Sequence, residues 1–214
     1  MTLKKIRNIC FFVFFVLSIV FLSHKMMYAY LIDTDIIKTT FVMGELVDDL
    51  TNDFVLKEHE ALDSDKNGVY ELGDNEVISN SYNVFPGVNI PKDPFVRIRS
   101  LNDRAYFYVE VVGESDDTLT WDLNDNWMKT TLKGKNNGIV YVYKGNSTDA
   151  IVLTRETVNN LVVYILDGID GSENGGIVVS EDFSTENAVN LSFYSYLVQA
   201  NGFDNYIDAF ESCF

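Results

Sequence analysis

The residues with the clearest potential for chemistry lie in one acidic stretch, residues 63–74, which reads DSDKNGVYELGD. Its oxygen-bearing residues recur with the spacing of the calcium-binding loop of an EF-hand, including the glycine at the sixth position. In such a loop, alternate residues direct hard oxygen ligands at a single ion. The sequence therefore predicts calcium as a cofactor, and the predicted ligands are Asp63, Asp65, Asn67, the carbonyl of Val69, Glu71 and Asp74.

Two features separate this stretch from a complete EF-hand. The last ligand position holds Asp74, whose side chain is too short to replace a bidentate Glu, and residues 75–82 do not have a helical pattern. The alternative is an ordinary acidic turn in a chain that is rich in Asp, Asn and Gly. For calcium we expect a dissociation constant of about 0.1–1 mM, as in extracellular modules.

The sequence lacks the common signatures of enzymes. It holds two histidines, His24 and His59. A zinc-protease helix that began at His59 would need a second histidine four residues later, where the chain has Asp63. Walker, G-x-S-x-G and G-x-G-x-x-G motifs are also missing. We therefore expect a protein without enzymatic activity, and we interpret His59 as a solvent-facing residue of a helix.

The first 29 residues have the pattern of a signal peptide. Three basic residues precede residues 9–22, an apolar run that is shorter than the roughly 20 residues of a membrane span. We expect a signal peptidase to cleave between Ala29 and Tyr30, which would make the protein secreted. The alternative is an uncleaved signal, which would be its one link to a membrane.

The mature chain, residues 30–214, is strongly acidic. Residues 1–29 hold four of the 16 basic residues and no acidic residue, so the remainder has a formal net charge of −20. Such a charge repels phosphate groups and argues against nucleic acid or an anionic membrane as a partner.

After residue 94 the sequence reads as short strands separated by turn residues. Residues 107–111 and 139–144 alternate between the two faces, as half-buried strands do, whereas residues 161–166 are apolar on both faces, as in a central strand. Further strands are predicted at residues 176–180 and 191–198.

Helical spacing is found in residues 51–62 and 206–213, and three prolines mark residues 85–94 as a connection within one domain. Together with the strands, these features predict an all-β fold. We expect a jelly-roll-like β-sandwich with one or two short peripheral helices.

Several segments, in order along the chain, resemble the SipW-dependent secreted proteins of the TasA/camelysin-like family of Gram-positive bacteria. They are residues 29–35 (AYLIDTD), 85–94 (FPGVNIPKDP), 102–109 (NDRAYFYV), 194–203 (YSYLVQANGF) and 207–210 (IDAF).

The resemblance implies a jelly-roll sandwich, export by a dedicated signal peptidase, and a structural or adhesive role in the cell surface or biofilm matrix. It also implies self-association or assembly with other matrix subunits. In relatives that form fibres, an N-terminal segment inserts into the next subunit as a donor strand, a form of β-augmentation. The corresponding segment is residues 30–46, and its apolar side chains are Ile36, Ile37, Phe41, Val42 and Met43. The alternative is that this segment pairs within its own domain.

Two other functions remain open. A calcium-stabilised carbohydrate-binding module would use exposed aromatic residues, and Tyr141 and Tyr143 share one face of a predicted strand. Packing within the sheet is the simpler explanation for these tyrosines. A metallopeptidase is suggested by the camelysin name of the family, but the missing histidines argue against it.

Overall fold

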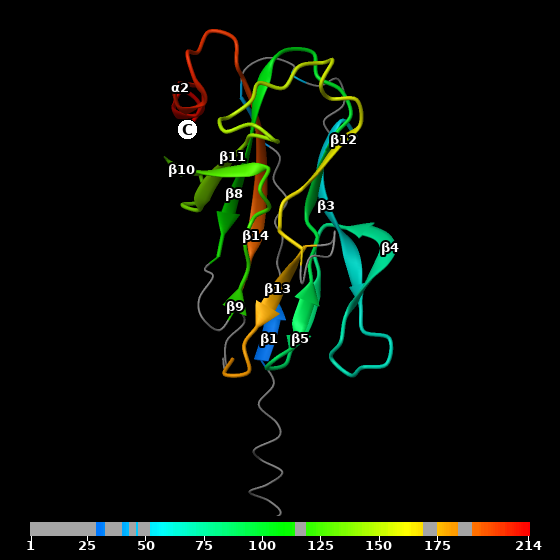
Figure 1. The fold of residues 1–214 in the computed structure, drawn as a ribbon. Coiled ribbons are helices and arrows are strands. Elements are labelled where there is room, and N and C mark those ends of the chain that lie inside the picture. Colours follow the sequence, from blue (N-terminus) through cyan, green and yellow to red (C-terminus); the bar gives the residue numbers. More distant parts are fainter. Residues whose placement is uncertain are drawn as a thin grey trace, which may run out of the picture.

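A computed structural model describes residues 29–32, 40–42, 46, 52–113, 119–168, 175–183 and 190–214. In these residues the chain forms an all-β sandwich with one short helix, which confirms the predicted fold class (Figure 1). The elements are β1 (Ala29–Ile32), β2 (Thr40–Val42), β3 (Phe54–Leu62), β4 (Glu71–Val77), β5 (Ser81–Val84), β6 (Asn89–Pro91), β7 (Phe95–Ile98), β8 (Ala105–Val112), β9 (Leu119–Thr120), β10 (Trp127–Lys133), β11 (Ile139–Tyr143), β12 (Leu161–Tyr164), β13 (Gly176–Val179), β14 (Ser192–Gln199) and α2 (Tyr206–Glu211).

Two sheets provide the main layers. One has the strand order β10-β11-β8-β14-β2, and the other has the order β12-β7-β3-β4. A smaller sheet, β6-β13-β9, and the pair β1-β5 complete the described strands. In Figure 1, β1, β5, β9 and β13 lie toward the end of the sandwich opposite α2.

The main core includes inward-facing residues from both layers. Phe54 and Leu56 of β3 contribute to it, as do Phe107, Val109 and Val111 of β8. These positions are two residues apart, as expected when alternate side chains of a strand point to the same face. The rings of Phe54 and Phe107 meet edge to face, with centroids 5.9 Å apart.

A second core contains the alternate residues of β8 and β14 together with residues of α2. Tyr108 and Tyr196 pack there with Phe210, and the Tyr108 hydroxyl donates a hydrogen bond of 2.6 Å to the carbonyl of Tyr206. Helix α2 confirms the predicted helix at residues 206–213. It begins after Asn205, whose side chain accepts hydrogen bonds from two backbone N–H groups of the first turn.

This second core corrects the interpretation of residues 107–111 as a half-buried strand. All but the last residue of β8 are buried, because its alternate side chains enter two different cores. The half-buried strand predicted at residues 139–144 is confirmed by β11, whose residues alternate between buried and intermediate.

The prediction of a helix at residues 51–62 is wrong, because Phe54–Leu62 forms strand β3. Phe54, Leu56 and Glu58 are buried and their neighbours are less so, which is the two-residue period of a strand. The expected central position of residues 161–166 is also wrong. Strand β12 lies at the edge of its sheet, with Val162 and Tyr164 exposed.

The proline-rich stretch at residues 85–94 contains one short strand. Its short strand β6 pairs only at one side, with β13, and forms an edge of the three-stranded sheet. An edge position suits Pro91, because proline has no N–H to donate to a second neighbour.

A buried carboxylate joins the two central strands to the β10–β11 turn. Glu110 of β8 is 0% exposed, and its two oxygens accept hydrogen bonds from Asn136, Gly138 and Tyr196. The turn can approach this closely because Gly134 has no side chain. A Cβ there would lie 2.1 Å from the Glu110 carboxyl carbon.

We predict that Glu110→Gln lowers the free energy of unfolding by about 3 kcal/mol, because the new amide N–H₂ group faces donors that need an acceptor. Urea denaturation measures the change. The matched control is Glu156→Gln at an exposed turn residue, for which we expect a change below about 0.5 kcal/mol. Equal effects of the two substitutions would contradict the role of the buried carboxylate.

Candidate functional site

Residues 63–70 of the acidic stretch form the loop between β3 and β4, and residues 71–74 begin β4 (Figure 1). The Asp63 carboxylate accepts hydrogen bonds from the backbone N–H groups of Asn67 (3.0 Å) and Gly68 (3.1 Å). Gly68 has φ +83°, and a Cβ there would lie 2.3 Å from the ring of Phe85. The turn and the nearby ring therefore require this glycine whether or not an ion is bound.

The predicted calcium ligands are brought together only in part. Asp65, Asn67, Val69 and Glu71 help to line a cavity of about 230 Å³. Asp63 and Asp74 are not among the residues that line this cavity, and Asp74 lies on β4 where its pairing with β3 changes register. Among the described residues, no three His, Cys, Asp or Glu side chains are grouped to hold a metal ion. Calcium binding stays a prediction.

The N-terminal segment contributes one strand to each of two sheets. Strand β1 pairs with β5, and β2 lies parallel to β14, with Phe41 opposite Leu197 and Val42 opposite Val198. The predicted cleavage residues, Ala29 and Tyr30, begin β1. Of the predicted assembly residues, Phe41 and Val42 belong to β2. The other three, Ile36, Ile37 and Met43, lie outside the described residues. Residues 1–28 of the predicted signal peptide also lie outside them.

Leu46 marks where this segment joins the core. Its side chain is buried, at 1% exposure, and its carbonyl accepts a 2.8 Å hydrogen bond from the N–H of Asn102. Leu46, the last residue of the predicted donor segment, is therefore part of the core of its own chain.

Two adjacent charge pairs connect β3 to the segment after β6, and neither pair was predicted from the sequence. Lys92 Nζ lies 2.7 Å from Glu58 Oε2, with side chains that are 0% and 2% exposed. Burial lowers the pKa of Lys92 to about 7, although the nearby Asp93 carboxylate acts to raise it. Lys92 and Asp93 stand between two prolines in the sequence. The partner of Lys92, Glu58, is 34 residues away, so no local pattern indicates the pair.

The second pair changes the interpretation of His59. This residue lies on a strand rather than on a helix, and its side chain is 28% exposed. Its Nδ1 is 2.6 Å from Asp93 Oδ2, and its backbone N–H donates to Asp93 Oδ1 at 3.0 Å. The buried carboxylate thus fixes both the ring and the strand, which is a structural use of the histidine.

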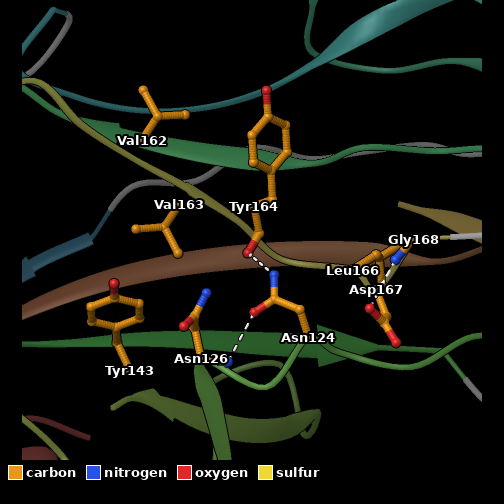
Figure 2. A pocket seen from close by; sticks show the side chains of 9 residues that line it. All are labelled: Asn124, Asn126, Tyr143, Val162, Val163, Tyr164, Leu166, Asp167 and Gly168. Atoms are coloured by element: carbon orange, nitrogen blue, oxygen red, sulfur yellow. Dashed lines mark hydrogen bonds between the residues drawn. The ribbon is translucent and has the colours of Figure 1, made fainter. Parts of the chain in front are cut away.

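A cavity of about 320 Å³ opens beside edge strand β12 (Figure 2). The Asn124 side chain shapes it by donating to the carbonyl of Tyr164 (2.6 Å) and accepting from the N–H of Asn126 (3.1 Å). Its lining residues are Asn124, Asn126, Tyr143, Val162, Val163, Tyr164, Leu166, Asp167 and Gly168. The cavity combines amide, carboxylate and aromatic groups, which suits a small polar ligand.

Of the two tyrosines considered for sugar binding, Tyr143 lines this cavity and Tyr141 does not. Both are partly buried against the main core, and burial raises the pKa of each hydroxyl. The Tyr143 ring lies 5.5 Å from that of Trp127 and 5.8 Å from that of Phe107. These contacts are packing within the sandwich, so neither tyrosine is an open aromatic platform.

We predict weak calcium binding by the acidic loop, with a dissociation constant of about 0.1–1 mM by isothermal calorimetry. Asp65→Asn removes a charged oxygen at the cavity and should weaken binding at least roughly tenfold. Asp125→Asn is the matched control, because Asp125 is an exposed turn residue outside this loop, and it should leave the affinity nearly unchanged. Absence of heat at millimolar calcium would rule out the site.

Helix α2 has six residues, and in the described part of the chain we find no helix with the length and apolar character to cross a membrane. Comparison of the chain with protein-family models, with curated proteins and with solved structures gave no significant match. Inferences about function therefore depend on the sequence and on the geometry described above.

Proposed function

We propose that this chain is a secreted, non-enzymatic structural or adhesive subunit of a bacterial cell surface or biofilm matrix. In this proposal, subunits of the TasA/camelysin type polymerise when residues 30–46 of one chain complete the β14 edge of the next. In the single chain β2 pairs with β14 of its own domain, and the proposal is supported by the position of this pairing, at an edge that β2 of a neighbour can also complete.

Strand β14 is long and buried, but the strand at its outer edge, β2, has only three residues. Seven of its eight residues are buried, and it pairs with β8 along its full length. Its other edge is paired with the three residues of β2. An edge of a buried strand needs a partner for its backbone groups, and the same bonds can be made with a strand of another chain.

The proposed exchange is open-ended. Each chain would donate one segment and accept another at a different surface, and such head-to-tail contacts produce fibres when the rotation does not close. The net charge of −20 on residues 30–214 opposes close packing of subunits. Salt, divalent cations or mild acid should therefore favour assembly by screening or neutralising carboxylates.

We predict that purified residues 30–214 form fibres visible by negative-stain electron microscopy, and that a chain starting at Gly44 does not. That start removes both β1 and β2 but keeps the buried Leu46. Excess peptide of residues 30–46 should shorten the fibres by occupying the β14 edge, whereas a peptide of scrambled sequence should not. Each preparation is examined with and without millimolar calcium. Monomers of the longer chain in every condition would contradict the proposal.

A carbohydrate-binding module is the second candidate, and the cavity beside β12 favours it. Asn126 and Asp167 offer polar groups to sugar hydroxyls, and Tyr143 offers part of a ring. Its size suits one or two sugar units rather than a long chain along an exposed face.

For this candidate we predict that hits in a glycan array bind with millimolar to high-micromolar affinity, and that Asn126→Ala weakens them at least about tenfold. The control is Asn146→Ala, at an exposed turn residue away from the cavity. An array without hits, or equal loss in both variants, would remove the second candidate.

A further inference from the structure

Lys92 and Glu58 form a contact that is unusual for ionisable residues. Both side chains are almost completely buried, at 0% and 2% exposure, and their Nζ and Oε2 atoms are 2.7 Å apart. Removing two charges from water carries a large desolvation cost, which their attraction offsets only in part. A reaction that eliminated both charges would remove this desolvation cost.

The backbone holds both residues in place. Lys92 lies between Pro91 and Pro94, and its N–H donates a 3.0 Å hydrogen bond to the carbonyl of Gly175. Glu58 is on β3, a strand paired on both sides, with β4 and β7. Fixed reacting groups at contact distance can behave as if they were present at about 10⁵–10⁸ M.

Burial disfavours the charged form of the Lys92 amine, whereas two neighbours favour it. The Phe193 ring, which is 1% exposed, has its centroid 5.7 Å from Lys92 Nζ in a cation–π contact, and the Asp93 carboxylate also acts to raise the pKa of Lys92. Burial lowers the pKa of Lys92 to about 7, so the nucleophilic form of the amine is populated near neutral pH. Exclusion of water also protects an amide product from hydrolysis.

We propose that Lys92 and Glu58 become joined by an isopeptide bond in the folded protein. Nζ forms a bond to Cδ of the carboxyl group, one carbon–oxygen bond breaks, and that oxygen leaves with two protons as water. An ammonium–carboxylate pair contains the same atoms as an amine and an acid. The step therefore needs no oxidant, reductant or other reactant, and it replaces two buried charges by one neutral amide.

A neighbouring ion pair shows why the reaction would be specific to this site. Lys57 Nζ lies 3.2 Å from Glu76 Oε2, but these side chains are 34% and 25% exposed. The Glu76 carboxylate is also hydrogen-bonded by Arg97, which lowers the pKa of that carboxyl to about 2. A hydrated ammonium and a stabilised carboxylate are both unreactive, so this pair serves as an internal control.

The test is tandem mass spectrometry of the full-length chain, denatured and digested with trypsin. Cleavage at unmodified Lys57, Lys66, Lys92 and Arg97 would release residues 58–66, 67–92 and 93–97 as separate peptides. A bond at Lys92 blocks cleavage there, so residues 58–66 and 67–97 stay together. Their joint mass is then lower by one water, about 18 Da, than the sum of the two unlinked peptides.

Lys92→Met is the matched variant, because it has no amine and must release residues 58–66 alone. Lys57→Met is the control at the exposed pair, and its peptide containing Glu58 should still be joined to residues 67–97. Release of residues 58–66 and 67–92 from the unmodified protein, each at its unlinked mass, would overturn the proposal. The result does not depend on fibre formation, so the two proposals fail independently.

Discussion

The pairing of β8 with β14 is the constraint on which the remaining structure depends. The two strands are joined across eight residue pairs, and nearly all their side chains are buried. Their alternate residues supply the main core on one face and the core under α2 on the other. Glu110 then attaches the β10–β11 turn to both strands. Because β14 is far from β8 in sequence, neither core is complete until the C-terminal part of the chain is in place.

Local sequence patterns predicted those elements whose burial does not depend on a distant segment of the chain. The alternation of residues 139–144 and the spacing of residues 206–213 are confirmed in β11 and α2. The pattern failed where a distant partner decides burial. Strand β3 carries Glu58, which reads as a solvent-facing residue but is buried against Lys92. Strand β8 is buried on its second face because α2 packs there, which the strand's own sequence cannot reveal.

The candidate sites also differ in whether local sequence or distant segments determine them. Residues 63–70 of the acidic stretch form a loop, and Gly68 has the turn conformation that the spacing required, but residues 71–74 are part of β4. Whether Asp74 joins the other ligands depends on the strand that follows, which the sequence did not specify. The cavity near Asn124 and the Lys92–Glu58 contact were not predicted, because each combines residues from segments far apart in the chain. Pairings of this kind become visible only in three dimensions.

The parallel pairing of β2 with β14 joins a segment that is synthesised early to one that is synthesised late. A ribosome produces residues 40–42 about 150 residues before β14, so for most of synthesis this segment has no complementary strand in its own molecule. In a finished neighbour that strand is already paired with the neighbour's own β2. In the proposed exchange, β14 of the same chain and β14 of a neighbour would compete for β2, and the local concentration of subunits would decide the outcome.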